Sequence, residues 1–174
     1  MSFAALLCAG LTLSGQLLSA QNLSTSSLSG RRAPGFSLPD SKLAQHDLLD
    51  YRGHWLVIDF MQTNCPHCQA LSKTLDEVKT RYGAKVAVLA IVVPPDNLGT
   101  VGKFISDYKI NYPILFDSSQ VAVSYFKATP QHSSIDMPHW FAIDPKGDIV
   151  RDWGQSSADT KDWVKEFDRL MSSK

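Results

Sequence analysis

The chain has 174 residues, of which 44% are hydrophobic, enough for one domain with a proper apolar core and a short tail. Its 17 basic side chains are matched by 17 acidic ones, and the sequence contains no basic cluster. Nothing in this balance supports binding to nucleic acid or electrostatic attachment to a membrane surface.

The N-terminal segment is typical of an export signal. Residues 1–20 contain no charged side chain and end in Leu18-Ser-Ala20, which places a small residue at the expected cleavage point before Gln21. We therefore predict a signal peptide over 1–20 and a protein that is periplasmic or otherwise extracytoplasmic. An uncleaved membrane anchor is the alternative, because about 18 apolar residues are near the minimum that spans a bilayer. The Ser-rich stretch that follows predicts a flexible linker over 21–32.

The hydrophobic pattern of the remaining residues, 33–174, predicts one α/β domain. Two nearly continuous apolar runs, 55–61 and 85–93, are typical of strands that are covered on both faces. In chain order, the first half should hold an extended segment at 36–40, a strand at 55–61, a helix that ends near Gly83, and a strand at 85–93. A helix at 98–108, a strand at 112–116 and a short helix at 121–126 should follow. The chain should then end in a hairpin of strands 139–144 and 149–153 and a closing helix around Trp163 and Phe167. These elements predict a mixed central β-sheet flanked by helices.

The stretch Cys65-Pro66-His67-Cys68 lies between the strand at 55–61 and the first helix. Pro66 suits the first helical turn, so Cys65 is expected at the N-terminus of that helix. The helix dipole, the free N–H groups and a neighbouring His67 imidazolium would all stabilise a thiolate at this point. We therefore predict Cys65 as the attacking thiolate and Cys68 as the more buried, resolving thiol, with Pro66 and His67 tuning the pair.

Two other interpretations of the pair are a zinc half-site and two inert core cysteines. A structural zinc site needs about four ligands, and no second CxxC or HxxxH motif follows. The third cysteine, Cys8, lies in the predicted signal peptide, so the mature protein would hold this pair alone. The spacing favours a redox-active disulfide between Cys65 and Cys68, with no other cofactor and no metal.

Several short stretches accompany the pair: Pro34-Gly35-Phe36, Gly53 with Asp59-Phe60, a strand–helix unit over 85–109, Tyr112-Pro113 before Asp117, Met137-Pro138, and Ile143-Asp144 with Gly147. Together they resemble the thioredoxin fold and, within it, the TlpA/ResA-like thiol–disulfide oxidoreductases, whose domain is of the AhpC/TSA or redoxin type. The resemblance covers roughly residues 33 to 170. It implies a thioredoxin-like fold with an N-terminal extension and an inserted β-α unit over 85–109.

The resemblance also assigns roles to three further residues. Pro138 matches a proline that these proteins hold in the cis form close to the disulfide, and the backbone of Met137 before it can pair with an extended substrate segment. Asp59 matches a buried acid that takes the proton of the resolving thiol, directly or through water. From the residues alone, a trans proline that opens an edge strand and an aspartate on the exposed side of its strand remain alternatives.

The chain departs from the family pattern near the predicted site. Met61 and Asn64 replace aromatic residues that usually precede the first cysteine. The stretch 126–136 is longer than the typical link to the proline, and we expect it to form a loop beside the active site that alters partner choice. His139 occupies a position that is usually small or hydroxylic, where it either tunes the thiolate or is an ordinary strand histidine.

The predicted function is thiol–disulfide exchange with protein substrates. The Pro-His dipeptide is similar to that of the strongly oxidising DsbA family, whereas the scaffold resembles proteins that mostly reduce, for instance during cytochrome c maturation. We expect a reductase that acts as a monomer with protein thiols or disulfides and a membrane electron donor or acceptor. Alternatives are a DsbA-like oxidase, a Cu(I)-binding protein that uses the cysteine pair, and a thiol peroxidase, although Thr63 is only two residues before Cys65 and the proline of the peroxidase motif is missing.

Overall fold

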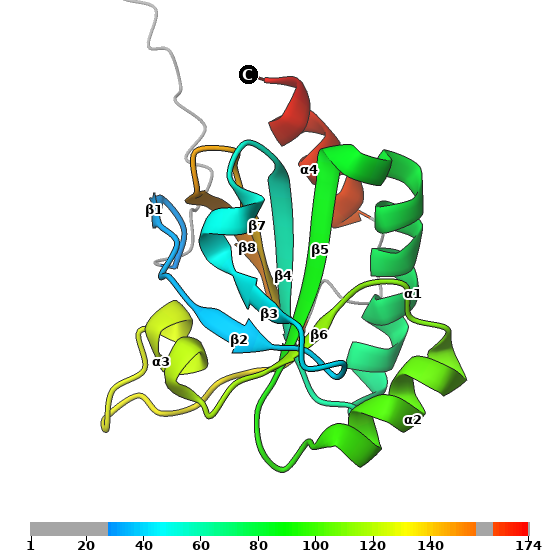
Figure 1. Cartoon of the computed structure of the whole chain (residues 1–174). Helices are drawn as coiled ribbons and strands as arrows, with labels where there is room; N and C mark the ends of the chain where they lie inside the picture. Colours follow the sequence, from blue (N-terminus) through cyan, green and yellow to red (C-terminus); the bar gives the residue numbers. More distant parts are fainter. Residues whose placement is uncertain (1–27, 156–161, 174) are drawn as a thin grey trace, which may run out of the picture.

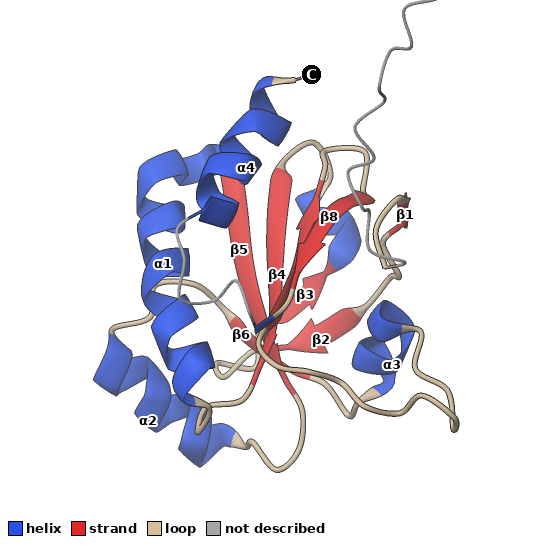
Figure 2. Ribbon diagram, turned by 180° about the vertical axis from the view of Figure 1, so that it is seen from behind, coloured by secondary structure: helices blue, strands red, loops and turns tan. Residues whose placement is uncertain are grey.

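Figure 1 shows the computed structural model of the chain, which describes residues 28–155 and 162–173. Helices lie on both faces of a central sheet, as the opposite views in Figures 1 and 2 show. Within those two ranges, no helix is long and apolar enough to cross a bilayer. The predicted signal peptide over 1–20 and the predicted linker as far as residue 27 lie outside the described residues.

Eight strands and four α-helices make up the described fold. The strands are β1 (Arg31–Arg32), β2 (Ser37–Pro39), β3 (Gln45–Asp47), β4 (Trp55–Met61), β5 (Val86–Val92), β6 (Ile114–Phe116), β7 (His139–Ile143) and β8 (Asp148–Trp153). The α-helices are α1 (Pro66–Tyr82), α2 (Leu98–Tyr108), α3 (Gln120–Phe126) and α4 (Asp162–Ser172), and the 3-10 helices are η1 (Leu48–Tyr51) and η2 (Gly83–Lys85).

The main sheet has six strands in the order β1-β8-β7-β4-β5-β6. Strands β4, β5 and β6 run parallel, whereas β7 is antiparallel to β4, β8 to β7 and β1 to β8. Strands β2 and β3 form a separate two-stranded sheet. The predicted fold class, a mixed sheet flanked by helices, is therefore confirmed.

Strand β4 lies at the centre of the sheet, between β5 and β7, and is buried along its whole length. Successive side chains of a strand point to opposite faces, so β4 contributes to two apolar cores. Val57 and Met61 face the core beneath α1, α2 and α4, whereas Ile58 and Phe60 face the core beneath η1 and α3. By the same alternation Asp59 points with Val57 and Met61 toward the side of the sheet that α1 covers.

Helix α1 begins and ends where the sequence predicts. Cys65 is its N-cap, with an extended backbone (φ −86°, ψ 119°), and Pro66 is its first residue. The helix ends at Gly83, whose φ of 54° lies in a region that favours glycine. The buried strand therefore delivers the chain directly to the positive end of a helix, with Cys65 at the junction.

The predicted linker boundary at residue 32 is wrong. Arg31–Arg32 forms β1, which pairs antiparallel with β8, and the Arg31 guanidinium donates a hydrogen bond to the Tyr125 carbonyl oxygen. Leu28 packs against the core beneath α3. The polar composition of this stretch concealed the strand, because edge-strand pairing uses backbone groups that the side chains do not reveal.

Candidate active site

Strand β4 leads at its carboxyl end into α1 (Figure 1), and the two cysteines lie at the start of that helix. Both cysteines are free thiols in the structure. Cys65 is partly exposed, and its Sγ accepts a hydrogen bond from the backbone N–H of Cys68 at 3.4 Å. Cys68 is fully buried one turn into the helix. A protein substrate can therefore reach Cys65 while Cys68 stays behind it.

The segment Met137–Pro138 faces Cys65 from the loop that precedes β7. The peptide bond between these two residues is cis, as the resemblance implies. The thiol of Cys65 makes a long contact of 3.8 Å with the Met137 carbonyl oxygen, across 72 positions of sequence. The fold thus places the exposed sulfur beside backbone groups of a second segment.

Asp59 lies beneath α1 in a dry environment. Its side chain is fully buried, so the alternative of an exposed aspartate is wrong, and neither of its carboxyl oxygens has a hydrogen-bond partner among the described residues. This burial raises the pKa of the Asp59 carboxyl well above its usual range. Burial and then the nearby Asp59 charge raise the pKa of the Cys68 thiol. The environment therefore disfavours the charged form of both groups.

Tyr112 belongs to the same buried cluster, although the sequence suggested no role for it in the site. Its hydroxyl is buried without a hydrogen-bond partner in the described part of the chain. Burial, followed by the charges of Asp59 and Asp76, raises the pKa of the Tyr112 hydroxyl well above its usual range. The signal available in the sequence was Tyr112-Pro113, where a side chain with a hydroxyl group lies two residues before β6.

The two residues between the cysteines occupy the first turn of α1. Pro66 is exposed and His67 is partly exposed, both beside Cys65. Their tuning roles stay predictions.

His139, on β7, pairs through Nε2 with Asp152 Oδ2 on β8 at 2.9 Å and packs edge-on against Phe126. These contacts favour its interpretation as a strand histidine held by its own partner.

The polar contacts that hold the turn before Cys65 could not be read from the sequence. Asp96, which follows a second cis bond at Pro94–Pro95, accepts hydrogen bonds from Thr63. A single aspartate after a Pro-Pro pair gives no signal of a partner that lies 33 positions earlier in the chain.

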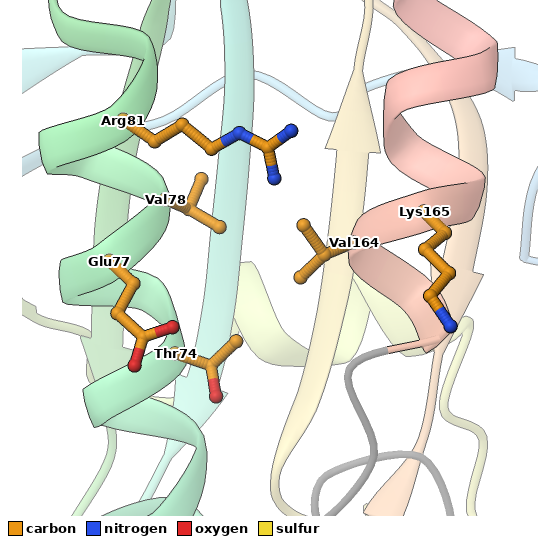
Figure 3. Close-up of a pocket in the computed structure, with 6 residues that line it drawn as sticks. All are labelled: Thr74, Glu77, Val78, Arg81, Val164 and Lys165. Atoms are coloured by element: carbon orange, nitrogen blue, oxygen red, sulfur yellow. The ribbon is translucent and has the colours of Figure 1, made fainter.

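A cavity of about 290 Å³ lies between α1 and α4, away from the thiols. Figure 3 shows its lining, which consists of Thr74, Glu77, Val78, Arg81, Val164 and Lys165. Neither cysteine lines it. Within residues 28–155 and 162–173, no three His, Cys, Asp or Glu side chains are grouped to hold a metal ion.

The fold and the paired thiols are those of the thioredoxin-like thiol–disulfide oxidoreductases. Residues 29–152 match the model of the AhpC/TSA family, and the chain belongs to that family. It is 30% identical over 121 residues to the thiol-disulfide oxidoreductase ResA of Geobacillus kaustophilus, a match that covers 69% of this chain and 66% of that protein.

Solved structures show a similar fold. The thioredoxin domain of a thiol-disulfide oxidoreductase from Bacteroides vulgatus matches with a TM-score of 0.64 at 18% identity, covering 80% of this chain and 96% of that one. A thiol:disulfide interchange protein of the thioredoxin family from Chlorobium tepidum matches with a TM-score of 0.62 at 18% identity, covering 74% of this chain and 91% of that one. At these identities the likeness shows a thioredoxin-like fold.

The asymmetry of the two thiols predicts selective alkylation. In the reduced, folded protein at pH 7, iodoacetamide should modify Cys65 at least about tenfold faster than Cys68, because the accessible thiolate is the nucleophile. Peptide mass spectrometry of the full chain carrying Cys8→Ser measures both rates. In denaturant the two rates should converge, and equal rates in the folded protein would contradict the assignment.

The burial of Asp59 predicts a stability that depends on pH. Because its pKa is raised in the folded state, the folded protein holds this proton more tightly than the unfolded chain does. Stability therefore falls as the pH rises from the ordinary value of 3.8 through the raised pKa. Asp59→Asn cannot ionise, so its melting temperature at pH 7 should exceed that of the wild type by at least about 3 °C.

This gain should disappear below the ordinary pKa of an aspartate, about 4, where the wild-type carboxyl is protonated in both the folded and the unfolded state. Asp107→Asn is the matched control, because Asp107 is exposed on α2 and pairs only with Lys103 among the contacts that the structure describes for it. Equal melting temperatures for Asp59→Asn and the wild type at pH 7 would show that Asp59 carries no such penalty.

Proposed function

We propose that the protein is an extracytoplasmic thiol–disulfide oxidoreductase that reduces disulfides of protein substrates through Cys65 and Cys68. The observation that carries this proposal is the placement of Cys65. Its sulfur is partly exposed at the N-terminus of α1, 3.8 Å from the carbonyl oxygen of Met137, with the buried Cys68 directly behind it.

The first step joins enzyme and substrate. The Cys65 thiolate attacks one sulfur of the substrate disulfide, so that a bond forms from Cys65 Sγ to this sulfur while the substrate S–S bond breaks. The second substrate sulfur leaves as a thiolate and takes a proton from solvent. The N-terminal charge of α1 and the Cys68 N–H stabilise the attacking sulfur, and Pro66 and His67 adjust this stabilisation.

The second step releases the substrate. Cys68 loses its proton and attacks Cys65 Sγ, which forms the Cys65–Cys68 disulfide and expels the first substrate sulfur as a thiolate. The substrate has then gained two electrons and the cysteine pair has lost them. A dithiol reductant, which we expect to be a membrane protein, must return them before the next cycle.

Asp59 is the proposed acceptor of the Cys68 proton. Burial favours a protonated Cys68, so a nearby group has to take this proton when the thiol attacks. Asp59 acts on Cys68 electrostatically and makes no competing hydrogen bond within the described part of the chain. Because its pKa is raised, the Asp59 carboxyl titrates closer to neutral pH than an ordinary aspartate does. A group that titrates near the working pH can both accept and return a proton.

Met137 and Pro138 form the proposed substrate-binding segment. The contact with Cys65 places the Met137 backbone beside the partly exposed sulfur. An extended substrate that pairs with this backbone would bring its own disulfide to Cys65. The loop over 127–136 joins α3 to this segment, and we propose that it contributes to partner choice.

Two observations bear on the direction of electron flow. Burial and Asp59 oppose a thiolate at Cys68, so the reduced pair gains no charge stabilisation at its second sulfur. A reduced form without such stabilisation has a lower potential and donates electrons more readily. His67 beside Cys65 acts in the opposite sense, which makes a DsbA-like oxidase the second candidate.

The export of the protein is proposed from the sequence of residues 1–20. Their apolar character and the small residue at Ala20 support a cleaved signal, with a membrane anchor as the alternative. Either form would place the domain on the outer side of the membrane.

The two-step mechanism predicts a trapped intermediate. In the full chain carrying Cys8→Ser, Cys68→Ser should accumulate a one-to-one mixed disulfide with a disulfide-bonded peptide, because the resolving thiol is missing. Cys65→Ser should form no adduct with the same peptide. With dithiothreitol as the electron donor, this variant should reduce the peptide disulfide at least about 100-fold more slowly than the protein with both cysteines. Intact mass before and after added dithiothreitol measures the adduct. An adduct on Cys65→Ser of equal yield, or full activity of either variant, would overturn the proposal.

A further inference from the structure

The turn between β4 and α1 is held from a neighbouring loop, and this suggests how the position of Cys65 is fixed. We propose that Thr63 and Asp96 form a clamp that positions the Cys65 sulfur at the N-terminus of α1. Both are positioning residues, since neither is placed to touch the reacting sulfur itself. The inference rests on the proposed thiol–disulfide function and adds a determinant of its rate.

The turn itself consists of residues 62–65. The backbone N–H of Cys65 donates to the Gln62 carbonyl oxygen at 3.2 Å, which closes four residues around Thr63 and Asn64. Cys65 then enters α1 as its N-cap. Any shift at Thr63 is therefore passed along two residues to the reactive sulfur.

Asp96 binds Thr63 through both of its carboxyl oxygens. The Thr63 backbone N–H donates to Oδ2 at 2.9 Å, and the Thr63 hydroxyl donates to Oδ1. The hydroxyl of Thr100, in the first turn of α2, donates to the same Oδ1 at 2.8 Å. One carboxyl group thus joins the turn before α1 to the start of α2.

The remaining polar group of Thr63 is also bound. Its carbonyl oxygen accepts a hydrogen bond from the side-chain amide of Gln69, on α1, at 3.0 Å. The N–H, hydroxyl and carbonyl of Thr63 therefore all have partners on other elements. Three directional contacts on one residue restrict its position far more than the single hydrogen bond that closes the turn.

The loop that carries Asp96 is itself well fixed. The backbone N–H of Asp96 donates to the Val93 carbonyl oxygen at 3.1 Å. The next residue, Asn97, caps α2 through its side-chain oxygen, which accepts from the Gly99 N–H at 2.9 Å. Strand β5 before this loop pairs with β4 in parallel up to Met61 and Val92. The clamp therefore ties the reactive turn to a rigid neighbour.

The alternative is that Asp96 only stabilises the first turn of α2, as acidic residues at helix starts commonly do. A substitution at the Thr63 hydroxyl distinguishes the two roles, because only the clamp needs this hydroxyl. Thr63→Val removes the hydroxyl while it keeps the shape, the β-branched backbone preference and the charge of the site. Thr63→Ser keeps the hydroxyl and is the matched control. Neither change touches the capping contacts of α2.

The test compares both variants in the full chain carrying Cys8→Ser. We expect Thr63→Val to slow alkylation of Cys65 by iodoacetamide and reduction of a peptide disulfide roughly three- to tenfold, the range for one lost hydrogen bond. Its alkylation profile should also move to higher pH, because a looser turn weakens the N-terminal stabilisation of the sulfur. Thr63→Ser should stay within about twofold of the wild type for both rates.

A double-mutant cycle supplies the second measurement, because it compares the combined effect of two substitutions with the effect of each one. Asp96→Asn combined with Thr63→Val should be no slower than the more impaired single variant, because the hydroxyl hydrogen bond lost in Thr63→Val ends on the same Asp96 carboxyl that Asp96→Asn replaces. Thr63→Val and Thr63→Ser with equal rates and equal pH profiles would overturn the clamp. So would effects of Asp96→Asn and Thr63→Val that multiply in the double variant.

The two proposals can fail separately. A wild-type protein that reduces no peptide disulfide overturns the proposed function, yet the alkylation of Cys65 still tests the clamp. Conversely, active protein with unaltered Thr63→Val overturns the clamp alone. Melting temperatures of all variants show whether any loss reflects unfolding instead of displacement of the sulfur.

Discussion

The junction between strand β4 and helix α1 is the constraint on which the rest of the site depends. Because β4 is buried on both faces, its position is fixed by two cores, and the helix that follows must start at one point. Cys65 occupies that point as the N-cap, and its sulfur takes the place of the side-chain oxygen that usually accepts the N–H of the second or third helical residue, here Cys68. Helix geometry then places Cys68 one turn further in, inside the core.

This geometry gives two chemically identical side chains different properties. Cys65 meets solvent, a helix N-terminus and the Met137 carbonyl, whereas Cys68 meets apolar side chains and a buried carboxyl. A nucleophile needs access and a stabilised anion, and a resolving thiol needs a proton acceptor that is absent from bulk apolar surroundings. Burial of Asp59 is costly to the fold because it disfavours the charged carboxylate, and the role that we propose for Asp59 depends on the same raised pKa.

Much of this site could be predicted from the sequence, because its main parts are local. The apolar run 55–61, Pro66 and Gly83 define the strand, the helix and hence the placement of Cys65. The cis bond at Pro138 came from the family resemblance. What escaped prediction depends on distant partners: β1 pairs through backbone groups of Arg31–Arg32 that composition does not reveal, and the contact of Asp96 with Thr63 joins two loops.

The reduction potential of the Cys65–Cys68 pair, measured by equilibrium with glutathione, tests the central claim most directly. If burial and Asp59 leave the reduced pair with little charge stabilisation at Cys68, the potential should be about −270 mV, the value of thioredoxin. A potential of about −120 mV, the value of DsbA, would contradict the proposed reductase and identify a protein that inserts disulfides.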